Sequence, residues 1–176
     1  VYAPADVYEL RSVMHYMAAN KQPTYMQLIR AKQPQIFDDT YRFDPNKAVV
    51  LKDGGDVTLV TTGYMVSFTL KAADELAQKG IKASVLHYPS VKPFDAATLI
   101  ASAGKTGAVV TIENQTILGG LGSAVCEVLS ENCPVRVKRL GIPDTFGEVS
   151  TENYMFNKHG FGISHIVAAA AALARK

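Results

Sequence analysis

This chain of 176 residues lacks the features that mark several specialised classes of protein. No segment concentrates Lys and Arg, and the formal net charge is only +2, which argues against nucleic acid or an acidic membrane surface as the main partner. No apolar run approaches the roughly 18 residues that a membrane span needs. What is present, 48% hydrophobic and 19% charged residues, is typical of a globular protein with a good core.

The signatures of metal and hydrolase sites are also missing. The two cysteines, Cys126 and Cys133, form no C-x-x-C pair, and we interpret them as reduced structural thiols of a cytoplasmic protein. The four histidines form no H-x-x-x-H pair, and no serine has the G-x-S-x-G setting of a hydrolase. Residue 1 is Val and no signal-peptide pattern follows it, so we expect a fragment or a processed chain.

From residue 47 onward, apolar segments of strand and helix type alternate. The pattern predicts strands over 47–51, 57–62, 83–87, 109–112 and 134–140, and helices over 63–79, from 95, from about 120 and over 163–174. Such alternation is typical of a three-layer α/β/α sandwich with a five-stranded, mostly parallel sheet. The connection over 52–56 is too short for a parallel crossover, so we expect the first two strands to form an antiparallel hairpin.

The first 46 residues have a different organisation. They predict a helix over 6–20, a strand over 24–29 and an irregular linker over 31–46 that contains two prolines and three aspartates. These elements have too little core of their own, so we expect them to be the end of another domain that exposes apolar faces when it is alone.

The glycine-rich segment Gly119-Gly120-Leu121-Gly122 comes shortly after the strand over 109–112 and opens a helix. Glycines at a helix start could hold a phosphate, but the dinucleotide fingerprint and the Walker loop do not match, so close packing of helix on sheet is the favoured interpretation. Glu113 ends that strand, where open α/β sheets place their ligands. It could act as a general acid or base, or cap the loop, and the second role is favoured because no histidine or second acid is near in sequence.

Arg30 follows the predicted strand over 24–29, next to the linker. A guanidinium in this place suits a phosphate or a carboxylate ligand. From the residues alone, a salt bridge between Arg30 and the acids of the linker is the favoured interpretation, and ligand binding is the alternative.

Four separated motifs carry a resemblance to a known family. The segments 85–95 (VLHYPSVKPFD), 109–113 (VVTIE), 119–125 (GGLGSAV) and 140–148 (LGIPDTFGE) occur in the order found in the C-terminal part of transketolases. The resemblance covers the whole chain. More specifically, the chain resembles the C-terminal section of the split, two-part transketolase-like enzymes. It implies that residues 1–38 are the C-terminal end of a pyrimidine-binding domain, that 39–46 is a linker and that 47–176 is the transketolase C-terminal domain.

The resemblance also implies an activity and its cofactors. Enzymes of this family use thiamine diphosphate and Mg2+ to transfer a two-carbon ketol unit between sugar phosphates, and they work as dimers. The Gly-Asp-Gly segment that holds the diphosphate and metal is absent here, as is the upstream glutamate that activates the thiazolium. We therefore expect the 176 residues alone to bind no cofactor and to be inactive, with the cofactor-binding domains upstream on the same chain or on a separate subunit.

Within the family, the arginine at the position of Arg30 contacts the substrate phosphate, and this makes Arg30 the one site residue that the resemblance predicts. Many relatives place a second arginine where this chain has Gln27, so its phosphate affinity or its substrate is expected to differ. Three alternatives stay open: 1-deoxyxylulose-5-phosphate synthase, the β-subunit of a 2-oxoacid dehydrogenase, and a non-catalytic docking or ligand-sensing module.

Overall fold

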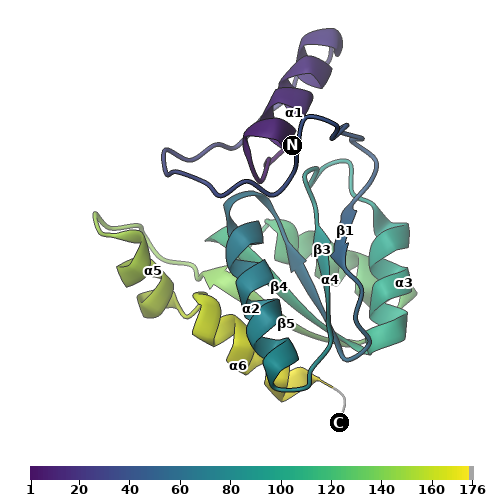
Figure 1. The fold of residues 1–176 in the computed structure, drawn as a ribbon, viewed down its shortest axis with the longest axis vertical. Helices are drawn as coiled ribbons and strands as arrows, with labels where there is room; N and C mark the ends of the chain where they lie inside the picture. The colour runs from purple at the N-terminus through teal and green to yellow at the C-terminus, as the bar shows by residue number, and fades with distance from the viewer. Residues whose placement is uncertain (175–176) are drawn as a thin grey trace.

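The computed structural model of the protein describes residues 1–174, in which a five-stranded sheet lies between two layers of helices (Figure 1). The strands are β1 (Val49–Lys52), β2 (Val57–Thr61), β3 (Ala83–His87), β4 (Ala108–Thr116) and β5 (Arg136–Ile142). Their order is β1-β3-β2-β4-β5, with β1 antiparallel to β3 and the other neighbours parallel. The predicted mixed, mostly parallel sheet and the three layers are confirmed.

The helices cover both faces of this sheet. The helices of the described chain are α1 (Val7–Ala19), the short 3-10 helix η1 (Gly63–Met65), α2 (Val66–Gln78), α3 (Ala96–Thr106), α4 (Leu121–Asn132), α5 (Glu152–His159) and α6 (Ile163–Leu173). Helices α2 and α6 pack on one face and α3 and α4 on the other. Helix α5 has no counterpart among the predicted elements, because its sequence is polar with a single buried residue, Phe156.

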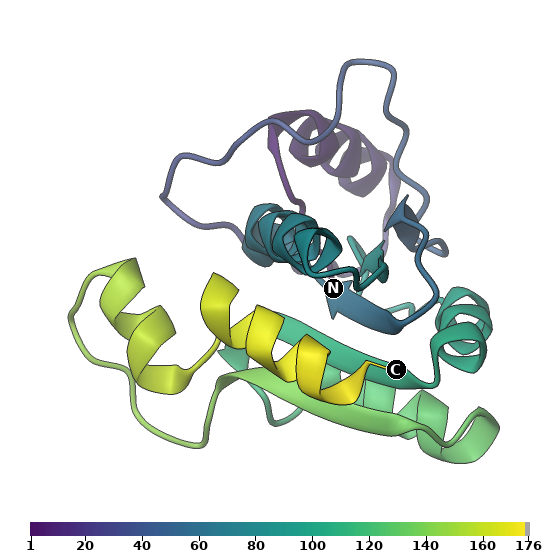
Figure 2. The ribbon, with the colours of Figure 1, turned by 60° about the horizontal axis from the view of Figure 1, so that its bottom comes forward.

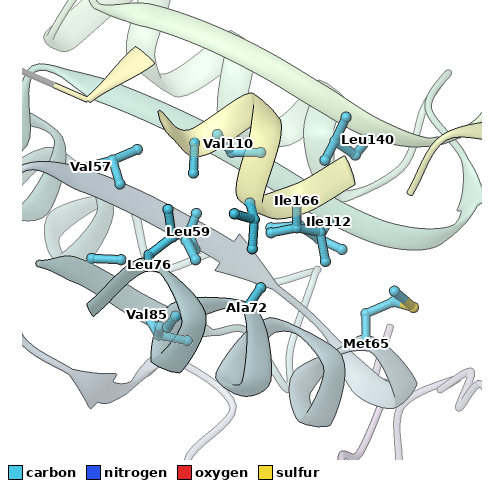
Figure 3. Packing of buried hydrophobic residues seen from close by; sticks show 14 of the residues in the cluster. Val57, Leu59, Met65, Ala72, Leu76, Val85, Val110, Ile112, Leu140 and Ile166 are labelled. Carbon is cyan, nitrogen blue, oxygen red and sulfur yellow. The ribbon is translucent and has the colours of Figure 1, made fainter. Parts of the chain in front are cut away.

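Two apolar clusters form the core because successive side chains of a strand point to opposite faces of the sheet. In β2, Leu59 belongs to the cluster beneath α2 and α6, and Val60 belongs to the cluster beneath α3 and α4. Ile166 of α6 lies over Ile112 and Leu140 in the first cluster (Figure 3). Each fully buried aliphatic side chain of this kind stabilises the fold by about 1.5–3 kcal/mol.

The predicted hairpin between the first two strands is wrong. Strand β1 is antiparallel, as expected, but it pairs with β3, and β3 lies between β1 and β2. The connection passes beneath the start of β3, where the Asp56 N–H donates to the Lys82 carbonyl at 3.0 Å. A Cβ on Gly54 would lie 2.3 Å from the same carbonyl oxygen, so only glycine allows this close passage.

The N-terminal helix α1 lies beyond one end of the sheet and not against either face (Figures 1 and 2). The predicted strand over 24–29 is reduced to one bridge, between Met26 and Tyr2, while residues 31–46 form no helix or strand, as expected. This region exposes large apolar side chains, with Val7 at 60% and Tyr25 at 62% exposure. Several large apolar side chains of this region are thus uncovered in the described chain.

Candidate functional site

The carboxyl ends of β2 and β4 form the switch point of the sheet. The chain leaves β2 toward β3 on one side and returns to β4 on the other side, which is where open α/β sheets leave a crevice for ligands. In this protein the N-terminal residues lie in that crevice. A Cβ on Gly63, directly after β2, would lie only 3.2 Å from the Cβ of Ala3.

Backbone hydrogen bonds hold the first residues in this position. Tyr2 donates its N–H to the Tyr25 carbonyl at 2.9 Å and accepts from the Gln27 N–H at 2.8 Å. On its other side the Ala3 N–H donates to the Pro89 carbonyl at 2.9 Å, just beyond the end of β3. The segment that carries residues 25–30 is thereby joined to the sheet through residues 1–3.

Glu113 occupies the anion-binding end of helix α4. Its side chain is 1% exposed, and its two oxygens accept from the N–H groups of Leu121 and Gly122 at 2.8 and 2.9 Å. Burial raises the pKa of this carboxyl group, while the two backbone donors act in the opposite direction. A Cβ on Gly120 would lie 2.1 Å from a Glu113 oxygen, which explains glycine at this position.

The helix start that resembles a phosphate site is therefore already filled by a carboxylate of the chain itself. The N–H groups that a diphosphate would need are the ones that Glu113 uses. The favoured role for Glu113, capping this loop, matches the geometry, and so does close packing at the glycines.

A second buried glutamate joins α1 to the sheet. Glu9 is 0% exposed and accepts at 2.7 Å from Nε2 of His87, which is also fully buried at the end of β3. Its oxygens also accept from the Ala5 N–H at 2.6 Å and from the Tyr41 hydroxyl at 2.5 Å. Burial, followed by the negative charge of Glu9, raises the pKa of Tyr41, so the phenol stays a hydrogen-bond donor.

Asp6 ties the linker to the same helix. One oxygen caps α1 by accepting from the N–H groups of Tyr8 and Glu9, at 3.0 and 2.9 Å. The other oxygen accepts from the N–H groups of Ile36 and Phe37, both at 2.7 Å. The position of the N-terminal region on the sheet thus depends on two buried acids, one turn apart at the start of α1.

Arg30 lines a cavity of about 330 Å3 beside the carboxyl ends of β4 and β5. The polar residues around it are Tyr64, Asn114, Glu148, Ser150 and Glu152, and the floor is apolar, with Ile142, Phe156 and Phe161. Both acids have other partners, because Glu148 pairs with Lys158 and Glu152 accepts from the Tyr64 hydroxyl. Within residues 1–174 the Arg30 guanidinium makes no ion pair, including none with the linker acids.

Gln27 lies close to this cavity. With Gln33 and Asn114 it lines a small adjoining cavity of about 10 Å3, and Ile29, Tyr64 and Asn114 line both. Gln27 also lines a third cavity, of about 230 Å3, which reaches Glu113 on the other side. The structure therefore places Arg30 and Gln27 near each other at the carboxyl end of the sheet. Glu113 does not line the cavity of Arg30, and both of its oxygens accept hydrogen bonds from the start of α4.

Neither a metal-ligand cluster nor a membrane helix occurs in the described part of the chain. Among residues 1–174, no group of three or more His, Cys, Asp or Glu side chains could hold a metal ion. No helix within the same range has the length and hydropathy to cross a bilayer. Both cysteines are free and half-buried.

Sequence reasoning missed the network of Glu9, Tyr41 and His87. The spacing of Asp6 and Glu9 is that of a capping box, and this signal could have indicated a structural role for Glu9. Its partners could not be found in the same way, because Tyr41 is 32 residues away and His87 is 78 residues away along the chain.

Comparison with known proteins gives one matching family model, "Transketolase, C-terminal domain", over residues 46–166. The 6-deoxy-6-sulfo-D-fructose transketolase subunit of Clostridium sp. (strain MSTE9) is 46% identical over 170 residues, which are 97% of this chain and 53% of that protein. A subunit of the apulose-4-phosphate transketolase of Actinobacillus succinogenes is 34% identical, over 98% of this chain and 56% of the relative. The chain thus spans about half the length of these curated relatives.

Relatives of a second activity and a solved structure were also found. The 1-deoxy-D-xylulose-5-phosphate synthase of Desulforudis audaxviator is 33% identical, over 99% of this chain and 28% of that protein. A solved structure described as a split-gene transketolase, an inactive β4 tetramer, superposes with a TM-score of 0.93 at 42% identity, covering 98% of this chain and 56% of the other.

Proposed function

The chain belongs to the transketolase family as a C-terminal section, and from this premise we propose that the complete enzyme transfers a two-carbon ketol unit between sugars that carry an anionic end group. The observation that carries the proposal is Arg30, a guanidinium that lines a cavity and makes no ion pair within residues 1–174. The names of two relatives specify a sulfo and a phosphate group on the sugar, and both groups are anions.

We propose that Arg30 holds this end group. A guanidinium can donate two parallel hydrogen bonds to two oxygens of a phosphate or a sulfonate, which fixes orientation as well as affinity. Binding energy gained at the far end of the sugar can be used to orient the reacting carbon. The apolar floor of the cavity, formed by residues such as Phe156, would exclude water from beneath the ligand.

Thiamine diphosphate and Mg2+ are proposed as cofactors of the complete enzyme, held outside these 176 residues. The residues present here do not fit the diphosphate, because Glu113 takes the N–H donors at the glycine-rich start of α4. Thiamine diphosphate, when bound, supplies the carbanion chemistry of ketol transfer. The contribution of this chain is then to bind and orient the substrate end group and to support the assembly.

We propose further that residues 1–38 complete a pyrimidine-binding domain, with 39–46 as linker and 47–176 as the C-terminal domain. The apolar side chains exposed on the N-terminal region, such as Met14 and Leu28, support this division, because the missing part of that domain would cover them. The complete enzyme is proposed to be a homodimer with respect to this chain and to work in the cytoplasm, which suits two free cysteines.

Substitution of Arg30 in the complete enzyme tests the proposal. Arg30→Ala is expected to raise the KM for the anionic sugar by about tenfold or more, as expected for loss of a charged hydrogen-bonding pair. The matched control is Lys32→Ala, which removes an exposed positive charge two residues away and should leave KM unchanged. Unchanged kinetics in Arg30→Ala would refute the role of Arg30.

The 1-deoxyxylulose-5-phosphate synthase activity remains the second candidate, because a synthase relative is 33% identical over 178 residues. The two activities differ in their product, because the synthase is named for making 1-deoxy-D-xylulose 5-phosphate, whereas ketol transfer moves a two-carbon unit between sugars. Formation of 1-deoxy-D-xylulose 5-phosphate by the complete enzyme would favour the synthase. Arg30 argues against a 2-oxoacid dehydrogenase, whose acyl substrates carry no phosphate, and no observation favours a docking module.

A further inference from the structure

Strand β4 departs from regular pairing where it reaches the cavity of Arg30. The regular pairs on either side of this point are Ile112 with Leu140 and Thr116 with Ile142. Between them, residues 113–115 of β4 lie opposite a single residue of β5, Gly141. A Cβ on Gly141 would lie 2.9 Å from each of two carbonyl oxygens of this bulge, so glycine is required there. Bulges redirect side chains and are frequent next to functional sites.

The bulge distributes its side chains between two cavities. Glu113 and Gln115 line the cavity of about 230 Å3 that reaches the start of α4. Asn114, between them, lines the cavity of about 330 Å3 that Arg30 also lines. The middle residue of the bulge therefore shares a cavity with Arg30, whereas its two neighbours do not.

Asn114 belongs to a rigid part of the fold. Strand β4 pairs with β2 on one side and β5 on the other, and the preceding residue, Glu113, accepts from two N–H groups at the start of α4 at 2.8 and 2.9 Å. Arg30, in contrast, lies in a segment with neither helix nor strand. A side chain on such a strand is well placed to orient a ligand that a longer, more flexible side chain also binds.

We propose that Asn114 is a second substrate-binding residue, whose amide NH2 donates a hydrogen bond to the anionic end group held by Arg30. This inference rests on the proposed role of Arg30 and adds to it a contact from the sheet. A carboxamide suits this position, because its NH2 group donates to a phosphate or sulfonate oxygen and its carbonyl can accept from a sugar hydroxyl. The end group then lies between the N-terminal region and the sheet, so that binding of the substrate joins the two parts of the chain.

The variant Asn114→Asp in the complete enzyme tests this contact, because it replaces the donor by a carboxylate of nearly the same shape. With a 6-phosphorylated or 6-sulfonated ketohexose as the sugar donor, we expect kcat/KM to fall by about tenfold or more, mainly through KM, because the new charge repels the end group. With the same ketohexose without an end group, kcat/KM should change by less than about twofold. The matched control is Gln115→Glu, which adds the same charge to the neighbouring residue outside this cavity and should leave both values unchanged.

A double-mutant cycle separates this inference from the proposed function. Asn114→Ala alone should raise KM for the anionic sugar by about three- to tenfold, and by much less when Arg30→Ala is already present, because both residues bind the same group. If Arg30→Ala raises KM and the Asn114 variants do not, this inference alone is overturned. Equal losses with the anionic and the neutral sugar would make Asn114 a structural residue and would overturn it too. If Arg30→Ala has no effect, or if neither anionic sugar is used, the proposed function falls as well.

Discussion

Two buried glutamates and the exposed Arg30 lie near the carboxyl ends of the strands, and their charges differ in how they are satisfied. Glu9 and Glu113 are 0% and 1% exposed, and every oxygen of their carboxylates accepts a hydrogen bond from this chain. Arg30 is exposed, lines a cavity and has no ion pair within residues 1–174. The charges that the chain satisfies internally are structural, whereas we propose that the charge of Arg30 binds a ligand.

The two candidate anion sites of the chain, the start of α4 and Arg30, differ in the same way. The start of α4 has the glycines and free N–H groups of a phosphate site, but the anion there is Glu113. Arg30 has no glycine motif around it and no ion pair within residues 1–174, and the anion that we propose for it is a ligand. A motif search would therefore select the filled site and overlook the open one.

If buried, hydrogen-bonded charges are structural, substitution of Glu9 should have the largest effect on the free energy of unfolding. Glu9→Ala leaves His87 buried without its partner and frees the Tyr41 hydroxyl, so the free energy of unfolding should fall by about 3–5 kcal/mol, as for other broken buried pairs. Urea unfolding of the purified protein measures this loss, with Glu75→Ala on the exposed side of α2 as the control. A loss below about 1 kcal/mol would show that burial does not make this carboxylate structural.

Substitution of Glu113 should have a smaller effect on the free energy of unfolding, and it should also leave the N–H groups at the start of α4 free to bind an external anion. Glu113→Ala leaves two N–H donors without an acceptor, which should cost about 2–3 kcal/mol, whereas Glu113→Gln keeps one acceptor and should cost less. Added sulfate should raise the melting temperature of Glu113→Ala by more than it raises that of the wild type, because the exposed helix start can then bind the anion. Equal sulfate effects at matched ionic strength would argue against an anion site at this helix.

Much of the fold follows from local signals along the chain. The helix that begins at Leu121 after the N-cap Gly120, and the helix capped by Asp95, were both predicted where the structure places them. Asp95 accepts from the Thr98 N–H, a contact between residues three apart, so local sequence is sufficient to find it. Predictions of this kind need no knowledge of the rest of the fold.

The predictions that failed concern contacts between residues that are far apart in the sequence. The hairpin prediction had the direction of β1 right, but nothing local indicates that β3 lies between β1 and β2, although Gly54 marks the close passage. Four residues can extend over roughly 13 Å, which is enough to cross two strand spacings of about 4.8 Å. For the same reason the pairing of Glu9 with His87 could not be predicted, and the predicted strand over 24–29 finds only Tyr2 as a partner in the described chain.

The smallest expected effect on stability is at Arg30, and it distinguishes an open charge from a filled one most clearly. Because the guanidinium is exposed and has no ion pair in residues 1–174, Arg30→Ala should change the free energy of unfolding by less than about 0.5 kcal/mol. The same variant is expected to lose substrate affinity in the complete enzyme, so stability and binding should separate. A loss of stability above about 1 kcal/mol would instead identify a structural partner, such as an acid of the linker, and would place Arg30 with the two glutamates.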